Sequence, residues 1–149
     1  MRLVLDTNVV VAGLLWLGPP RRLMDHAIEG RFELCSSTVL IEELTRTLGY
    51  SKFAQRMAQH ETNVTTLVAQ YQALTYLLIP SHIPRVVPRD ADDDHVVACA
   101  VAAQADMIVT GDRHLLELER FRGISIIKPA EALEFIGRYP PTAARPGGR

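Results

Sequence analysis

The sequence predicts a three-layer α/β/α sandwich around a central parallel sheet. Short apolar runs, typical of strands that are buried on both faces, alternate with longer segments in which apolar residues repeat at helical intervals. This alternation favours a parallel sheet covered by helices on both faces and joined by right-handed crossovers. The chain has 149 residues, enough for one domain with a sizeable core, and we expect that domain to span residues 1–138.

The predicted strands are residues 2–6, 32–35, 85–87, 107–110 and 124–127. The predicted helices are residues 9–17, 21–29 and 39–48, one or two helices within 52–78, residues 95–104, a helical turn at 115–118, and a last helix from Pro129. The run at 2–6 is too short for a helix and apolar on both faces, so it predicts a central strand.

Glycine, proline and capping residues set the boundaries in the first half of the chain. Gly18-Pro19-Pro20 ends the first helix, and Gly30 ends the second. Ser36, Ser37 and Thr38 are candidate N-cap residues for the helix at 39–48. The predicted apolar stripe of that helix is Leu40, Leu44 and Leu48.

In the second half, Leu67, Tyr71, Leu74 and Leu78 repeat at helical spacing. Three prolines break the segment that follows, and Gly123 precedes the last strand. Pro129 is well placed to begin a helix. The residues expected to face inward from that helix are Ala130, Leu133, Phe135 and Ile136. The tail, residues 139–149, is rich in proline and glycine, so we expect it to be disordered.

The composition resembles that of an ordinary globular protein. Hydrophobic residues make up 48% and charged residues 22%, as in soluble globular proteins, and the net charge of −1 shows no basic excess. A nuclease is still possible, because acidic catalytic residues offset a local basic patch. Cys35 and Cys99 lack zinc-type spacing, so we expect two buried structural thiols. The sequence predicts no membrane span and no signal segment, hence a cytoplasmic protein.

Two carboxylates stand just after predicted strands. Asp6 follows the first strand and Asp112 follows the strand at 107–110. Functional sites of parallel α/β folds form at the carboxyl ends of strands. Each residue has a structural alternative. Asp6 could form a turn, which is the better interpretation of that residue alone. Asp112 could cap the helical turn at 115–118, which is as good as the functional interpretation.

Glu43 lies at the edge of the apolar face of its predicted helix, beside Leu40 and Leu44, whereas Glu42 points to solvent. Burying a carboxylate without a partner costs several kcal/mol. A metal ion would offset that cost. An ion pair with Arg46 would do so equally well, and the sequence leaves both interpretations open.

A cluster of acidic residues stands at the start of the helix at 95–104: Asp90, Asp92, Asp93 and Asp94. The structural alternative is a solvated helix start that the helix dipole favours. Asp93 lies one turn before Val96 and Val97, so we expect it to face inward and Asp94 to lie on the flank. We expect Asp90 and Asp92 to precede the helix. Asp93 is the first choice for a site residue, and Asp94 is its rival.

Several carboxylates without histidine or cysteine ligands suit a hard cation. Mg²⁺ or Mn²⁺ prefers oxygen donors and keeps bound waters, so a few carboxylates suffice. Without a cation, neighbouring carboxylates repel and raise one another's pKa values. A bound ion removes that repulsion, acidifies water and stabilises charge on a phosphodiester.

Four segments together resemble the PIN-domain family, in particular the VapC-type toxins of toxin–antitoxin systems. They are Leu3-Val-Leu-Asp-Thr-Asn8, Ser37-Thr-Val-Leu-Ile-Glu-Glu-Leu44, Asp90-Ala-Asp-Asp-Asp94 before an alanine-rich helix, and Ile108-Val-Thr-Gly-Asp-Arg-His-Leu-Leu116. No single segment is specific for this family, but the four segments in this order and spacing are strong evidence together. The resemblance covers residues 1–136 and implies a metal-dependent endoribonuclease that uses Mg²⁺ or Mn²⁺ and leaves a 5′-phosphate and a 3′-hydroxyl.

The resemblance also assigns residues and partners. Its acidic metal ligands fall on Asp6, Glu43, Asp93 and Asp112, with Asp90 as the upstream partner of Asp93 and Asp94 as the alternative register. Asn8 and Thr110 fall where the family has polar support for the water ligands of the metal. The resemblance further implies an RNA substrate, a homodimer and a cognate antitoxin protein.

Arg89 and Arg113 are close to the acidic residues in sequence and could bind the RNA backbone, although an exposed salt bridge is the stronger interpretation of each. Two other functions remain open. One is a phosphate hydrolase with Asp6 as nucleophile, whose usual pattern has a second aspartate at the position of Asn8. The other is a non-catalytic partner-binding module, with an antitoxin groove formed by the apolar segments 9–17 and 67–78.

Overall fold

The structure is a computed structural model that describes residues 1–80 and 91–138. The strands are β1 (Arg2–Leu5), β2 (Glu33–Ser37), β3 (Thr75–Leu78), β4 (Met107–Val109), β5 (Arg120–Phe121) and β6 (Ile124–Ile127). The helices are α1 (Thr7–Leu15), α2 (Pro19–Ile28), α3 (Thr38–Leu48), the 3-10 turn η1 (Ser51–Phe53), α4 (Ala54–Gln59), α5 (Val64–Leu74), α6 (Ala91–Ala103), α7 (Arg113–Leu116) and α8 (Pro129–Arg138).

The strands form one sheet in the order β3-β2-β1-β4-β6-β5. The pairs β3–β2, β2–β1, β1–β4 and β4–β6 are parallel, and β5 adds an antiparallel edge to β6. β1 therefore lies inside the sheet, between β2 and β4, as its continuous apolar run predicted. The carboxyl ends of β1, β2, β4 and β6 lie at one edge of the sheet, which we call the carboxyl edge.

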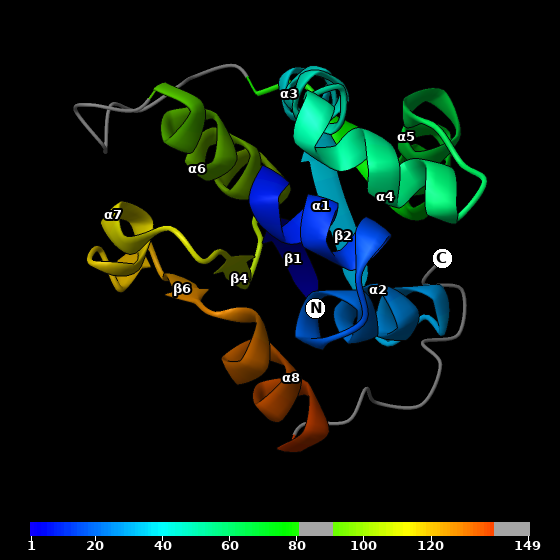
Figure 1. Cartoon of the computed structure of the whole chain (residues 1–149). Coiled ribbons are helices and arrows are strands. Elements are labelled where there is room, and N and C mark those ends of the chain that lie inside the picture. The colour runs from blue at the N-terminus through cyan, green and yellow to red at the C-terminus, as the bar shows by residue number, and fades with distance from the viewer. Residues whose placement is uncertain (81–90, 139–149) are drawn as a thin grey trace.

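Helices cover both faces of the sheet, so the predicted α/β/α sandwich is confirmed. Successive residues of a strand point to opposite faces, so Leu3 and Leu5 pack in one core with α1, α2, α5 and α8. Val4 packs in the other core with Ile108 and the buried face of α6. In Figure 1, α6 lies above β1 and β4, and α2 and α8 lie below them.

The edge strands differ from the prediction. The repeat that ends with Leu74 and Leu78 predicted helix as far as residue 78, but Thr75–Leu78 is strand β3, paired with β2. The hydrogen bonds of β2 outweigh the helical spacing here. β5 was not predicted, because two residues carry no periodicity. The strand expected at 85–87 and the tail at 139–149 lie outside the described residues.

Three helices also differ in detail. α2 begins at Pro19, so Pro19-Pro20 opens this helix instead of ending the previous one. α6 begins at Ala91, so the prediction that Asp92 precedes the helix was wrong. In α8 the buried residues are Ala132 and Ile136. Ala130 and Phe135 are exposed, so their predicted inward orientation was wrong, because the buried stripe lies elsewhere on the helix.

Cys35 of β2 and Cys99 of α6 are buried free thiols, as expected. Burial raises the pKa of the Cys35 thiol, and it raises the pKa of the Cys99 thiol to about 12. Both side chains are therefore neutral at physiological pH and act as small apolar residues.

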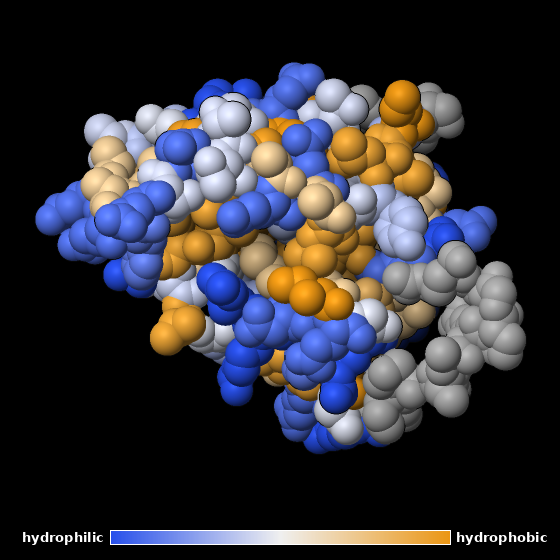
Figure 2. Space-filling view, turned by 90° about the vertical axis from the view of Figure 1, so that its right-hand side faces the viewer, coloured by the Kyte–Doolittle hydropathy of each residue, from blue (hydrophilic) through white to orange (hydrophobic). Residues whose placement is uncertain are grey.

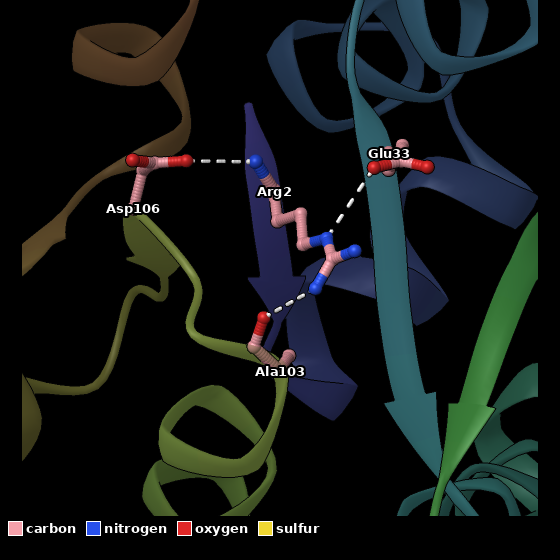
Figure 3. Close-up of polar contacts among 4 residues, drawn as sticks. All are labelled: Arg2, Glu33, Ala103 and Asp106. Atoms are coloured by element: carbon pink, nitrogen blue, oxygen red, sulfur yellow. Dashed lines mark hydrogen bonds and ion pairs between the residues drawn. The ribbon is translucent and has the colours of Figure 1, made fainter. Parts of the chain in front are cut away.

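Arg2 joins several elements at the amino edge of the sheet (Figure 3). Its backbone N–H donates to Asp106 Oδ2 at 2.9 Å, and its guanidinium donates to Glu33 Oε1 at 3.3 Å and to the Ala103 carbonyl at 2.9 Å. These contacts fix the start of β1 against β2 and the end of α6. The register of β1 is thereby set at the edge opposite Asp6.

Among the described helices, none combines the length and the apolar character that a membrane span requires.

A strained two-residue turn connects β5 and β6. Arg122 has φ +49° and Gly123 has φ +80°, and Phe121 pairs with Ile124 across the turn. Two positive φ values are typical of a type I′ turn, which favours Asn-Gly. A side chain such as that of Arg122 costs about 1 kcal/mol or more in this conformation.

We expect Arg122→Asn to stabilise the protein by about 0.5–1 kcal/mol, because asparagine tolerates the left-handed conformation better. Thermal unfolding followed by circular dichroism would show a rise of a few degrees in Tm, of the order of 2–4 °C per kcal/mol. Arg122→Ala is the control, because alanine keeps the strain. Equal Tm values for the two variants would contradict the strain argument.

Candidate functional site

The segments that carry the predicted acidic residues converge at the carboxyl edge. Asp6 directly follows β1, and Asp112 follows β4, its neighbour in the sheet. α3 begins at the end of β2, on the other side of β1. α6 runs back along the sheet to the start of β4, so its first turn lies at the same edge. The topology therefore brings four distant parts of the sequence to one edge.

Thr110 links the ends of β1 and β4. Its hydroxyl donates to Asp6 Oδ2 at 2.8 Å and accepts the backbone N–H of Asp112 at 3.0 Å. Asp6 Oδ1 accepts the backbone N–H of Thr7 at 2.8 Å. Thr110 is fully buried and Asp6 is 6% exposed, so these bonds are shielded from competing water. They fix the orientation of the Asp6 carboxylate relative to Asp112.

Asp112 caps α7, which confirms the structural interpretation of this residue. Its Oδ1 accepts the backbone N–H of His114 at 2.7 Å and that of Leu115 at 3.3 Å. Leu115 is fully buried, so the cap is anchored in the core. The cap uses Oδ1 of the Asp112 carboxylate and does not involve Oδ2. Asp112 is partly exposed, and a structural cap is therefore compatible with a second role.

The first turn of α6 carries two buried carboxylates. Asp93 is 4% exposed and Asp94 is 1% exposed. Asp93 faces inward as predicted, but the flank position predicted for Asp94 was wrong. Because both carboxylates are buried, burial does not show which of Asp93 and Asp94 is the better candidate. Asp90 lies outside the described residues.

Glu43 is half-buried on α3, between the buried residues Leu40 and Leu44, whereas Glu42 is exposed. Its predicted position at the edge of the apolar face is confirmed. The N-cap of this helix is Ser37, whose hydroxyl accepts the backbone N–H of Leu40 at 3.3 Å. The start of the helix is therefore fixed to the end of β2.

Three predicted site residues remain: Asn8, Arg113 and Arg89. Asn8 is exposed in the first turn of α1. Arg113 is exposed and pairs with Glu117 at 3.8 Å, so the exposed salt bridge is confirmed for this residue. Arg89 lies outside the described residues.

The donor chemistry of the carboxyl edge fits a hard cation. Asp6, Asp93 and Asp94 are buried carboxylates, and burying several negative groups needs compensating positive charge or hydrogen bonds. Within residues 1–80 and 91–138, no three His, Cys, Asp or Glu side chains lie close enough together to hold a metal ion. Mg²⁺ usually binds through one or two carboxylates and keeps several waters, so its site needs no closed cage.

Sequence reasoning missed two features of this edge. The link through Thr110 depends on the pairing of β1 with β4, over 104 positions of sequence. A hydroxyl at the end of a buried strand, next to Gly-Asp, was the available signal. The burial of Asp94 depends on what packs against the first turn of α6, and the local sequence carries no signal for it.

A cavity of about 240 Å³ lies away from the carboxyl edge, between α1, α2 and α5. Its apolar lining includes Leu14, Met24 and Leu74, and Arg21 and Gln70 are its polar members. It lies between the two segments predicted for a partner groove. On the face of the molecule in Figure 2, hydrophobic side chains gather in the middle and toward the upper right, with many hydrophilic ones to the left and below.

The fold and the edge together define an α/β/α sandwich with buried carboxylates at the carboxyl ends of its central strands. A family model described as PIN domain matches residues 2–114, and the chain belongs to this family. The predicted family resemblance is thereby confirmed.

A similar solved structure supports the fold. It is described as the crystal structure of VapBC2 from Rickettsia felis bound to a DNA fragment from their promoter. The match has a TM-score of 0.58 and 15% sequence identity, and it covers 85% of this chain and 97% of that chain. At this identity the similarity shows a shared fold. A search of the curated proteins finds no match.

Proposed function

We propose that this protein is a metal-dependent endoribonuclease and the toxin of a type II toxin–antitoxin pair. Membership of the PIN-domain family supports the nuclease assignment. The main structural support is the buried hydroxyl of Thr110, which fixes Asp6 relative to Asp112 across two neighbouring strand ends. We propose residues 1–138 as the nuclease domain, acting in the cytoplasm as a homodimer.

The proposed metal ligands are Asp6, Glu43, Asp93 and Asp112, with Asp90 and Asp94 as further candidates. A bound Mg²⁺ or Mn²⁺ ion would supply a more acidic water and positive charge for the phosphodiester. Thr110 holds Asp6 in one orientation, and the cap of α7 does the same for Asp112. Asn8 is the proposed polar support for bound water. Because these hydrogen bonds fix Asp6 and Asp112 in advance, little reorganisation of the two carboxylates is needed when RNA binds.

A digest of total cellular RNA tests the nuclease. The wild-type protein is incubated with Mg²⁺ or Mn²⁺, with and without a chelator, beside Asp6→Ala and Asp112→Ala, and the fragment ends are mapped. We expect metal-dependent cuts that leave a 5′-phosphate and a 3′-hydroxyl. Cuts common to all three proteins would identify a contaminating nuclease. A wild-type protein that cuts nothing with either metal would overturn the assignment.

The antitoxin is proposed to bind at the cavity between α1, α2 and α5. The solved structure with the similar fold is a VapBC2 complex, which supports a toxin–antitoxin role by analogy of fold. The cavity has the apolar lining that an anchoring side chain of a partner requires. If the RNA digest shows no activity, partner binding here is the second candidate function.

We expect Ala73→Arg to weaken binding of a candidate antitoxin by about tenfold or more, because a charged side chain would fill the mouth of the cavity. Isothermal titration calorimetry with the purified antitoxin measures the change. Gln72→Arg is the matched control, because Gln72 is exposed on the same helix and does not line the cavity. Equal affinities of the two variants would place the partner elsewhere.

A further inference from the structure

Lys128 stands at the carboxyl edge, two strands away from Asp6. β6 pairs with β4 in parallel, with Val109 opposite Ile127. The backbone N–H of Thr110 donates to the Ile127 carbonyl at 3.0 Å, so Lys128 leaves β6 beside Thr110. Two strand spacings separate the backbones of Lys128 and Asp6, roughly 10 Å. A carboxylate, a hydroxyl and an ammonium therefore follow one another on three neighbouring strand ends.

The backbone of Lys128 is fixed, whereas its side chain is exposed. Its N–H donates to Glu131 Oε1 at 3.3 Å, and its carbonyl accepts the N–H of Ala132 at 3.0 Å. Pro129 follows directly and restricts the chain further as the first residue of α8. Glu131 thus contacts the backbone of Lys128. Within the described part of the chain, the ammonium of Lys128 takes part in no ion pair.

Another cation near this edge, Arg113, is less available. Arg113 already pairs with Glu117 on α7. In the proposed function the metal ion supplies positive charge to the phosphate that is cut, and the neighbouring phosphates need contacts of their own. The net charge of the chain is −1, so no general basic field attracts these phosphates. A cation at the end of a neighbouring β-strand, such as Lys128, can hold the RNA beside the acidic residues.

We propose that Lys128 binds a phosphate of the RNA strand next to the one that is cut, and so positions the strand along the carboxyl edge from β1 to β6. This inference rests on the proposed nuclease function. Because two strand spacings separate the backbones of Lys128 and Asp6, we assign Lys128 to the neighbouring phosphate, as a positioning residue that contributes to binding. An arginine at this position would keep the contact, because it keeps the charge.

Substitutions of Lys128 test whether this residue contributes to RNA binding or to the cleavage step. We expect Lys128→Met to raise KM for an RNA substrate about tenfold, the value of one charge-assisted contact, with kcat nearly unchanged. Lys128→Arg should restore the wild-type KM. In the Asp6→Ala background, which leaves the RNA uncut, the same change should weaken RNA binding and lower the slope of log K against log salt by about 0.7.

The chain has only one other lysine, Lys52, which provides a matched control. Lys52 is exposed in η1, beyond the end of α3 that is remote from the carboxyl edge, and its ammonium lies 5.1 Å from the Phe53 ring centroid. Lys52→Met should leave KM and RNA binding unchanged. If the wild type cuts RNA and Lys128→Met has the same KM and salt slope, the positioning role is overturned and the nuclease stands. If the wild type neither binds nor cuts RNA, both proposals are overturned.

Discussion

Asp6→Ala is expected to lower RNA cleavage by about 10³-fold or more, the largest loss of activity in this protein. Asp6 directly follows β1, a strand inside the sheet, and its carboxylate is fixed by Thr7 and Thr110. Loss of a proposed metal ligand removes both charge compensation and orientation at the reacting phosphate. The measurement is the initial rate of cleavage of a labelled RNA with Mg²⁺ and with Mn²⁺.

The fold should survive this change. Alanine leaves the Thr110 hydroxyl and the Thr7 N–H without their acceptor, which costs about 1–3 kcal/mol, but it also removes a buried negative charge from an edge that holds Asp93 and Asp94. Urea unfolding should therefore give a similar free energy. Asp25→Ala is the control, because Asp25 is exposed and pairs with Arg21 on α2, away from the carboxyl edge. Cleavage by Asp6→Ala within threefold of the wild-type rate would refute the assignment.

Thr110→Val should lower both stability and activity. Valine has nearly the same shape but places a methyl group against Asp6 Oδ2 and the backbone N–H of Asp112. The buried Asp6 carboxylate and the partly buried N–H of Asp112 then lose a partner, and we expect a loss of about 1–3 kcal/mol in the free energy of unfolding. Cleavage should fall by about 10- to 100-fold, the usual effect of removing a group that orients a metal ligand.

Thr110→Ser separates the hydroxyl from the methyl group. Serine keeps both hydrogen bonds and loses one buried methyl group, so its activity should stay near that of the wild type. Denaturant unfolding and cleavage rates of both variants make the comparison. Equal activity of the valine and serine variants would mean that the hydroxyl does not orient Asp6 for catalysis.

Two inner strands, β1 and β4, could be predicted from the sequence because they are apolar on both faces. Arg2–Leu5 and Met107–Val109 have no amphipathic alternation, and this pattern fits few structures other than buried parallel strands. The edge strands were harder. Thr75–Leu78 continues a helical repeat and becomes a strand through its pairing with β2, and that pairing has no local signal.

The candidate site was predictable to a similar degree. The position of Asp6 and Asp112 after strands follows from local patterns, and so does the position of Glu43 at the edge of an apolar helix face. The bond from Thr110 to Asp6 depends on which strands are neighbours, and Lys128 enters only through the register of β6 on β4. Both contacts depend on the strand order, which could not be predicted from the sequence.

The central position of β1 also governs how the molecule opens. Its amides are bonded to strands on both sides, and Leu3 and Val4 are fully buried under helices on both faces. Such a strand exchanges its amide hydrogens with solvent only when the whole protein unfolds. Asp6 ends this strand, so local fluctuations of the peripheral helices leave its position intact. We therefore expect the arrangement of residues at the carboxyl edge to be lost when the whole protein unfolds cooperatively, and not before.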